Sequence, residues 1–366
     1  MGKRYDVAVV GLGGMGSAVL AHAAKRGLRA IGFEQFSRGH DRGASSGRSR
    51  MIRKAYYEHP SYVPLLLRAY HAWRELESET ETRLLHITGL LMTGDDRSEI
   101  LTGALRSAQT YGLPVETLRS RDVRSRFPMF ALRENERAVY EVDGGFIVPE
   151  AAVEAHLRVA ERSGASLAFN AHADRLEEID AERVVVCAGP WLDRVIRDLN
   201  VPLRVERNVQ HWFVPERPNF GIGRCPSFLI ERPEFERALY GFPDYGFGVK
   251  AAFHGSGAET RAEALDRAVH ESDIAPVRAA LNAALPGAAG EHLEGKACMY
   301  TLTPDAHFII SPHPRDPKVI VVGGFSGHGF KFTPVVGEIV ADLLATGQSR
   351  YDIGFLSAER FAGLGN

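Results

Sequence analysis

The sequence reads Gly11-Leu12-Gly13-Gly14-Met15-Gly16 directly after the apolar run Val7–Val10, and a helical pattern that Gly27 can close, Ser17–Arg26, follows it. A strand, a glycine-rich turn and a helix in this order are typical of a dinucleotide-binding unit. The glycines let the backbone approach a pyrophosphate and let helix and strand pack closely, with the phosphates at the positive end of the helix. Glu34 stands about 20 residues further on, where a carboxylate accepts the ribose hydroxyls of an adenine dinucleotide. This stretch therefore predicts an adenine dinucleotide site on a parallel sheet.

Other apolar runs along the chain resemble the first one. Val184–Val186 and Val319–Val322 are equally rich in valine, and Ala30–Phe33 is a shorter run. Short continuous apolar runs of this kind are typical of parallel strands that helices cover on both faces. Because the runs lie far apart, we expect an α/β fold in which a Rossmann-like cofactor-binding domain is assembled from separated segments.

A second kind of pattern separates these runs. Residues 204–253 carry aromatic and β-branched side chains broken by prolines, which predicts an α+β substrate domain with a mostly antiparallel sheet. The expected division of the chain assigns residues 1–84, 145–203 and 296–366 to the cofactor-binding domain and residues 85–144 and 204–295 to the substrate-binding domain.

The composition argues against several classes of protein. With 366 residues, 45% of them apolar, the chain is long enough for two packed domains. A formal net charge of -2 argues against nucleic acid as a partner, since phosphate binding requires a strongly basic face. Glycines interrupt the apolar run near the start, so no membrane span is expected. Cys187, Cys225 and Cys298 are too few and too scattered for a disulfide framework or a zinc site, so we expect no metal and a reducing, cytoplasmic setting.

Several further segments resemble the hallmarks of the monomeric sarcosine oxidase and N-methyltryptophan oxidase family. They are Gly47–Tyr56 (GRSRMIRKAY), Gly324–Phe332 (GFSGHGFKF), Lys296–Thr301 (KACMYT), Tyr62–Leu65 (YVPL) and Tyr240–Pro243 (YGFP). The likeness runs, with gaps, from Tyr5 to about Phe355. The resemblance implies FAD as the cofactor and a small secondary amine, such as an N-methyl amino acid, as the substrate. It further implies an imine product that hydrolyses, oxygen reduced to hydrogen peroxide, and a monomeric enzyme.

The loop from Arg38 to Lys54 is basic, with Asp41 as its one acid. Such a loop alone would be a solvated surface, but after a dinucleotide motif it indicates a segment folded over phosphates and a substrate carboxylate. Arg50 and Arg53 are three residues apart, so a helical turn would place them side by side. The resemblance implies that Arg53 binds the substrate carboxylate in bidentate geometry and that Arg50 lies beside the flavin ring, where positive charge favours the reduced anion.

The C-terminal motif leads into a helix. Thr333 and Pro334 read as its N-cap and first-turn proline, and apolar residues then recur at helical spacing through Leu343. The positive end of such a helix would point towards the flavin. Lys331 lies just before it, and the resemblance implies that this lysine is the second ligand of the substrate carboxylate.

A strand pattern follows the glycines at 246 and 248. Alternation places residues 250, 252 and 254 on one face, so we expect Lys250 and His254 to face the same cavity. By resemblance, Lys250 activates oxygen as a cation beside the flavin, and His254 is an active-site histidine. Tyr240 and Tyr300 match tyrosines that line the substrate pocket.

Cys298 stands in the context of the family's flavin attachment site, so the resemblance implies a thioether between its sulfur and the flavin. A buried cysteine is otherwise a small apolar residue, which is our interpretation of Cys187. The remaining contacts to the cofactor that the resemblance implies fall on Ser49, Arg50, Ala188, Gly189, Trp191, Gly324, Gly327, His328, Gly329, Phe330 and Lys331.

The chain departs from the family at three places. Ser45 and Ser46 stand where relatives carry two histidines, one of which lines the active site. Residues 170–183 form a short connection without the peripheral hairpin of relatives, and Asn208–Phe213 is bulkier than a sarcosine-sized cavity requires. These differences leave the identity of the substrate open, but they do not change the interpretation of the cofactor.

Four alternatives stay open at this point. Two remain among flavin enzymes, a cyclic amino acid oxidase acting on pipecolate or proline and an FAD amine dehydrogenase that avoids oxygen. The third is an NAD-dependent dehydrogenase built on the same glycine motif, and the fourth is a flavin-binding subunit without catalysis.

Overall fold

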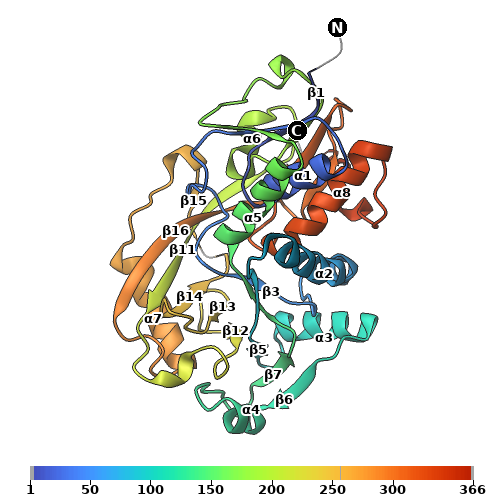
Figure 1. The fold of residues 1–366 in the computed structure, drawn as a ribbon. Helices are drawn as coiled ribbons and strands as arrows, with labels where there is room; N and C mark the ends of the chain where they lie inside the picture. The colour runs from blue at the N-terminus through green and yellow to red at the C-terminus, as the bar shows by residue number, and fades with distance from the viewer. Residues whose placement is uncertain (1–3, 256, 364–366) are drawn as a thin grey trace.

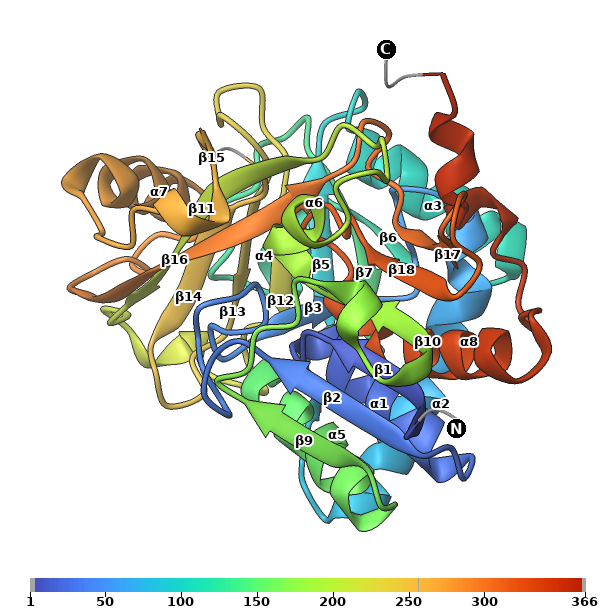
Figure 2. The same ribbon diagram turned by 90° about the horizontal axis from the view of Figure 1, so that it is seen from above.

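The computed structural model describes residues 4–255 and 257–363, and a six-stranded sheet forms one half of it (Figures 1 and 2). The strand order is β17-β18-β10-β1-β2-β9, and the strands are parallel except for β17, which runs antiparallel to β18. Their bounds are β1 Tyr5–Val10, β2 Ala30–Glu34, β9 Ser166–Phe169, β10 Ala181–Val186, β17 Ile309–Pro312 and β18 Val319–Gly323. The four strands predicted from apolar runs are confirmed, and they are the four central strands of this sheet.

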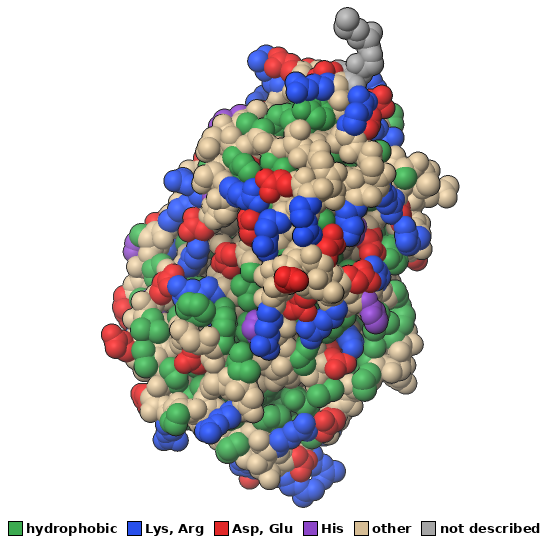
Figure 3. Space-filling view, viewed as in Figure 1, with side chains coloured by type: hydrophobic (Ala, Val, Ile, Leu, Met, Phe, Trp, Pro, Cys, Tyr) green, Lys and Arg blue, Asp and Glu red, His purple; other side chains and the backbone are tan. Residues whose placement is uncertain are grey.

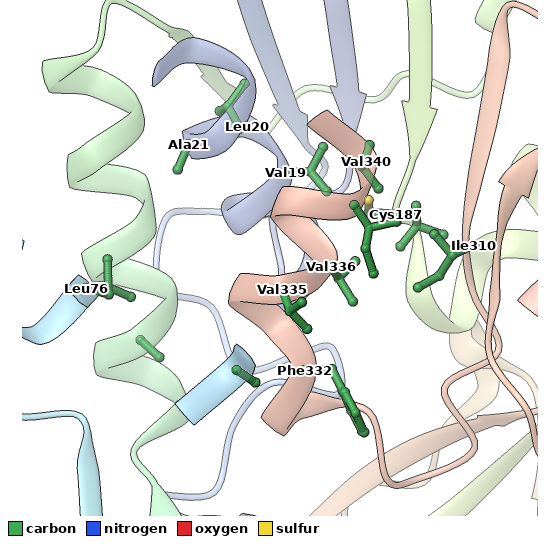
Figure 4. Close-up of a cluster of buried hydrophobic side chains, with 14 of the residues drawn as sticks. Val19, Leu20, Ala21, Leu76, Cys187, Ile310, Phe332, Val335, Val336 and Val340 are labelled. Carbon is green, nitrogen blue, oxygen red and sulfur yellow. The ribbon is translucent and has the colours of Figure 1, made fainter. Parts of the chain in front are cut away.

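Helices cover both faces of the sheet, as the continuous apolar runs require. On one face, Val7 and Val9 pack into a core with α1 (Gly14–Lys25), α5 (Pro149–Arg162) and α8 (Thr333–Thr346). Figure 4 shows Val19 of α1 beside Val340 of α8 in this core. On the other face, Val10 and its neighbours pack against the short helix α6 (Leu192–Val195). Burial of each such side chain contributes about 1.5–3 kcal/mol to the free energy of folding, so these two cores stabilise the cofactor half.

The second half is built on a nine-stranded, mostly antiparallel sheet, which confirms the expectation for residues 204–253. The order is β15-β11-β14-β13-β12-β5-β7-β6, with β16 paired to β11, and only β12 and β5 among these pairs are parallel. The strands are β5 Leu90–Gly94, β6 Glu116–Arg119, β7 Arg137–Glu141, β11 Arg204–Phe213, β12 Ser227–Ile230, β13 Leu239–Phe242, β14 Val249–Phe253, β15 Glu259–Thr260 and β16 His292–Leu302. Helices α2 (Val63–Thr80), α3 (Glu99–Tyr111), α4 (Ser120–Arg126) and α7 (Glu271–Ala284) complete the fold.

A small third sheet joins the two halves and corrects one expectation. Strand β3 (Arg50–Ile52) pairs antiparallel with β8 (Gly145–Ile147), which also pairs with β4 (Leu85–Ile87). Arg50 therefore begins a strand, and the helical turn expected over Arg50 and Arg53 is wrong. The three-residue spacing of two arginines does not stabilise a helix, whereas this segment gains backbone hydrogen bonds by pairing with β8.

The two helix starts near the cofactor motifs also differ from expectation by a few residues. Helix α1 begins at Gly14 instead of Ser17, and Gly27 with a φ of +80° follows its C-cap. Helix α8 has Phe332 as N-cap, so the predicted N-cap Thr333 is instead its first residue. The reason is that a 3-10 turn, Phe330–Phe332, runs directly into α8, and the Thr333 hydroxyl donates to the Phe330 carbonyl at 2.6 Å.

One expected domain boundary, at residue 296, lies within a strand of the larger sheet. Residue 296 falls inside β16, which pairs with β11 from Arg204↔Leu302 to Phe213↔His292. A strand of the larger sheet thus spans the expected boundary and carries its last residues towards the cofactor half. The division itself remains a prediction.

The surface face in Figure 3 carries Lys and Arg intermingled with Asp and Glu. Within residues 4–255 and 257–363, none of the helices is both long and apolar enough to cross a membrane.

Candidate active site

A cavity that is partly open to solvent lies at the carboxyl ends of the central parallel strands. The segments that line it include the turn after β1, the ends of β2 and β10, and the loop after β18. Ligands of open α/β sheets bind at this edge. The candidate cofactor residues that line it are Gly11, Gly13, Gly14, Met15, Glu34, Arg50, Ala188, Gly189, Trp191, Gly324, Gly327, Gly329 and Phe330.

The glycine turn is shaped for a dinucleotide. A Cβ on Gly16 would lie 1.7 Å from the Gly11 carbonyl oxygen, so only glycine lets α1 begin this close to β1. The Gly14 N–H donates to the Ser45 hydroxyl at 2.9 Å. Ser45, which departs from the family pattern, therefore lies over the positive end of α1 in the cavity wall.

Glu34 is held in place at the end of β2. Its carboxylate accepts the Leu12 N–H at 2.9 Å and the Phe36 N–H at 3.0 Å, and it is 5% exposed. His40 lies 3.3 Å away. A carboxylate fixed by backbone donors at the cavity edge fits the ribose of an adenine dinucleotide.

Unused polar atoms also fit a bound cofactor. The buried Ser49 hydroxyl has no hydrogen-bond partner within the described part of the chain. Cys298 is 2% exposed, its sulfur lies 3.7 Å from Arg50 Nη2, and the next residues along β16, Met299 and Tyr300, line the cavity. Buried polar atoms are normally satisfied. Because neither Ser49 nor Cys298 itself lines the two cavities, their contact with the cofactor remains a prediction.

A smaller cavity meets the first one, and Arg50, Tyr300, Gly327 and Phe330 line both. The predicted site residues that line this second cavity are Arg50, Arg53, Tyr240, His254, Tyr300, Gly327, His328, Phe330 and Lys331. The structure therefore brings together side chains from residues 50 to 331, and the second cavity is the candidate substrate chamber.

Arg53 forms an ion pair that the sequence analysis missed. Its Nη2 donates to both Glu58 oxygens at 2.6 and 2.7 Å, and its guanidinium lies over the rings of Tyr56 and Tyr57. Burial raises the pKa of Glu58, but Arg53, together with His328, Lys331 and a backbone hydrogen bond, more than offsets this effect, so the pKa lies below its ordinary value. Nε and Nη1 of Arg53 are buried and have no partner within the described residues. Arg53 thus retains two unused donors.

Lys331 lies beside Arg53 and is 4% exposed. Its ammonium donates to the His328 carbonyl at 2.6 Å and lies 5.1 Å from the centre of the Tyr56 ring. Burial, and then the charge of Arg53, lowers the pKa of Lys331 to about 7. Two cationic groups that line the same cavity are suited to binding one carboxylate.

His254, Tyr300 and Tyr240 form the opposite wall. The Tyr300 hydroxyl lies 3.4 Å from His254 Nδ1, and the Tyr240 ring meets His254 edge to face. Burial lowers the pKa of His254 to about 4, so the imidazole is neutral near pH 7. A neutral imidazole between two tyrosines can orient an uncharged amine by hydrogen bonding.

His328 is also fixed by its neighbours. Its Nε2 lies 3.0 Å from the Ala306 carbonyl, which can only accept, so Nδ1 accepts from the Tyr56 hydroxyl at 2.6 Å. Burial lowers the pKa of His328 to about 3. The residue connects the loop after β18 to the segment that carries Arg53.

Lys250 corrects the expectation that it shares a cavity with His254. Among the described residues, those lining the two cavities include His254 but not Lys250, which is 1% exposed. Strand β14 ends at Phe253, so the alternation does not extend to His254. The Lys250 ammonium instead donates to the carbonyls of Gly47 and Ser49 at 2.6 and 2.8 Å. Burial, and then the Arg50 charge, lowers its pKa well below the ordinary value.

Two further residues of the site were not among the candidates named in the sequence analysis. Glu150, at the start of α5, accepts the Gly47 N–H at 2.6 Å and orders the loop that holds Lys250. Gln210 of β11 accepts from Arg50 at 3.2 Å. Each pair is more than 100 residues apart in the chain, so spacing could not have indicated it.

Comparison with known proteins agrees with this geometry. A family model described as FAD dependent oxidoreductase matches residues 6–343. A monomeric sarcosine oxidase of Streptomyces avermitilis is 40% identical over 384 residues and covers 99% of each chain. An N-methyl-L-tryptophan oxidase of Yersinia pestis is 34% identical over 372 residues, or 98% of this chain and 99% of that one.

Solved structures with the same fold include NikD, an amino acid oxidase essential for nikkomycin biosynthesis. Its TM-score is 0.84 at 24% identity, over 96% of this chain and 97% of that chain. An L-proline dehydrogenase of P. horikoshii has a TM-score of 0.84 at 20% identity, over 99% of both chains.

These matches decide between the cofactors that the glycine motif left open. The matching family uses FAD, so the interpretation as an NAD-dependent dehydrogenase is wrong. The relatives at 33–40% identity share nearly the full length of the chain. The chain is therefore a member of the FAD-dependent oxidoreductase family, in the group of the monomeric sarcosine oxidases and the N-methyl-L-tryptophan oxidases.

Proposed function

We propose that the protein oxidises a small N-methyl amino acid, with FAD joined to Cys298 and with oxygen as the final electron acceptor. The observation that carries the substrate class is Arg53, a buried arginine with two unused donors beside Lys331 in the second cavity. The relatives named for sarcosine and N-methyl-L-tryptophan support the same class. The products are an imine, which water hydrolyses, and hydrogen peroxide.

The cationic pair positions the substrate. Arg53 and Lys331 bind its carboxylate, which places the amine end towards Arg50, Tyr300 and Gly327, where the two cavities meet. Such positioning makes the step effectively unimolecular and can lower the activation free energy by about 7 kcal/mol or more in favourable cases. Bound FAD supplies the two-electron acceptor that amino acid side chains lack.

The wall of His254, Tyr240 and Tyr300 acts on the amine. Because His254 is neutral, it can hold the uncharged amine by accepting a hydrogen bond from the amine N–H. The substrate carbon beside nitrogen loses a hydride equivalent, the nitrogen loses a proton, and a C=N double bond forms. Arg53, His328 and Lys331 are among the buried residues of the chamber lining.

Cys298 is the proposed point of covalent attachment. Its sulfur lies 3.7 Å from Arg50 Nη2 and 3.9 Å from the Ala44 carbonyl oxygen, and Arg50 and Ala44 both line the first cavity. Forming the carbon–sulfur bond removes one hydrogen from the thiol and one from a flavin carbon, and oxygen accepts the two electrons.

Acid precipitation of the holoenzyme tests this attachment. Wild-type protein is expected to precipitate with its flavin, whereas Cys298→Ala releases the flavin into the supernatant. Cys225→Ala removes a thiol of the second core and should behave as wild type. Free flavin from precipitated wild-type protein would contradict the thioether and leave the amine chemistry open.

The low pKa of Lys331 predicts a pH dependence of substrate binding. The group is cationic below about pH 7 and loses its charge as the pH rises, so affinity for a carboxylate falls. With one proton linked to binding, the Kd of propionate should rise by up to about tenfold per pH unit above 7. This Kd is measured at each pH between 6 and 9 by titrating the holoenzyme with propionate and following the flavin spectrum.

Lys331→Arg is the matched control for that titration, because arginine keeps its charge across this range. Its Kd should be nearly constant from pH 6 to 9. A wild-type Kd that is equally constant would show that Lys331 does not titrate in this interval.

Anaerobic addition of single amines to the purified holoenzyme tests the proposed function. Sarcosine or N-methyltryptophan is expected to bleach the oxidised flavin absorbance within the dead time of manual mixing. If only pipecolate or proline bleached the flavin, the substrate would be a cyclic amino acid and not an N-methyl amino acid. A bound flavin that none of the four amines bleaches would contradict the proposal and direct attention to Ser45 and Ser46.

We further propose that the protein is monomeric and works in a reducing compartment such as the cytoplasm. The three cysteines are free and buried, which agrees with such a setting. Its partners are then the amine and molecular oxygen.

A further inference from the structure

We infer that Gln210 is a positioning residue for Arg50, whose guanidinium it holds beside the flavin without neutralising its charge. The inference rests on the proposed function, since that function gives Arg50 the task of stabilising the reduced cofactor. It concerns a side chain within the segment Asn208–Phe213, which departs from the family pattern.

Arg50 has only neutral partners. Nη1 donates to the Ser49 carbonyl at 3.0 Å and to Gln210 Oε1 at 3.2 Å, and Nη2 donates to the Ala44 carbonyl at 3.0 Å. Over the described ranges, no carboxylate lies within ion-pair distance of this guanidinium. Arg53, three residues on, is by contrast paired with Glu58. Arg50 thus lacks an ion-pair partner where both cavities meet, and Glu150 acts on its charge only from beyond ion-pair distance.

The chemistry of the two groups fixes the orientation of the Gln210 amide. An arginine can only donate, so the amide oxygen must face it and the amide nitrogen must point away. Gln210 is 2% exposed and lines the second cavity. In the described residues, its amide oxygen accepts a hydrogen bond from Arg50.

Gly47 shows how closely the amide is fitted. This glycine has a φ of +102°, and a Cβ on it would lie 2.2 Å from Gln210 Oε1 and 3.2 Å from Arg50 Nη1. The carbonyl of the same residue accepts from Lys250. Gln210 thus packs on the loop that arranges both buried cations, and a side chain at position 47 would displace it.

A neutral acceptor is the important property of position 210. A carboxylate would hold Arg50 equally well, but it would cancel the positive charge that favours the reduced flavin anion. An apolar side chain would preserve the charge and release the guanidinium from its orientation. Glutamine preserves both the charge and the orientation.

The midpoint potential of the bound flavin distinguishes these cases. Gln210→Glu is expected to lower the equilibrium constant for two-electron reduction about tenfold, which is a shift of about 30 mV to lower potential. Gln210→Leu should give a smaller decrease in that constant, about threefold. The control is Gln109→Glu, the same charge change at an exposed position of α3, which should leave the potential unchanged. Titration of each holoenzyme with dithionite and a reference dye measures the potential without an amine.

Two results would overturn the inference. One is a Gln210→Glu potential equal to that of Gln109→Glu. The other is a lower melting temperature or flavin content with an unchanged potential, which would make Gln210 a packing residue only. If Gln210→Glu does not retain flavin, Gln210→Leu decides by the same titration. Because no amine enters the measurement, a shifted potential would support the inference even if none of the four amines bleached the wild-type flavin.

Discussion

Replacing Lys250 with methionine is expected to slow the reaction of the reduced enzyme with oxygen by roughly 100- to 1000-fold, the range seen when one preorganised charge or donor is removed from a reacting centre. The Lys250 ammonium is held by the carbonyls of Gly47 and Ser49 and lies over the rings of Trp212 and Phe242. It has no carboxylate partner in the described residues, so its charge is available to the negative charge that develops when oxygen accepts an electron. Stopped-flow mixing of reduced enzyme with oxygen measures this step.

Flavin reduction by the amine serves as the internal control. It depends on the chamber of Arg53, Lys331 and His254, which Lys250 does not line, and should change by less than about tenfold. Lys25→Met removes an exposed lysine of α1 and should leave both steps as in wild type. An oxygen step that is unchanged in Lys250→Met would remove Lys250 from the proposed chemistry.

Replacing Arg53 with methionine is expected to lower kcat/KM for the amine by about 100-fold or more, because a bidentate, charge-assisted contact to a buried carboxylate is lost. The same change should lower stability by about 3 kcal/mol, because it leaves Glu58 buried without its partner. Loss of activity alone would therefore not separate binding from folding.

A second variant separates the two effects. Arg53→Met combined with Glu58→Gln leaves no unpaired charge, so the melting temperature should recover most of the loss while kcat/KM stays low. Steady-state kinetics measure kcat/KM and thermal unfolding measures the melting temperature of both variants. Recovery of activity together with stability would show that Arg53 supports the fold and does not bind the substrate.

The cofactor half could be predicted because its signals are local. Valine-rich runs indicate strands buried on both faces, and the glycine turn needs no knowledge of distant residues. The strands β9 and β17 were missed for a local reason too, since Ser166–Phe169 is not a continuous apolar run and Ile309–Pro312 ends in Ser311 and Pro312. Both are edge strands of the sheet, where one side of the strand is unpaired and burial is weaker.

The chamber was less predictable because its contacts join distant segments. The family resemblance gave Arg53 and Lys331, but not the Glu58 carboxylate that occupies one side of Arg53. The acceptors that hold Lys250 are backbone carbonyls about 200 residues away, and no side-chain pattern indicates a carbonyl. Strand periodicity alone placed Lys250 in a cavity that the loop from Gly47 to Ser49 covers.

The sheet order also determines when this protein can acquire its cofactor during synthesis. Strand β1 leaves the ribosome first, but its neighbour β10 pairs with β18, which begins at Val319. At about 5–20 residues per second, β18 follows β1 after roughly 15–60 s. Until then the loop that ends at Lys331 is missing from the cavity, and FAD cannot stabilise the nascent chain through it. The Gly11–Gly16 turn must stay free of aggregation over that interval, so we expect the cofactor to bind after release rather than to guide early folding.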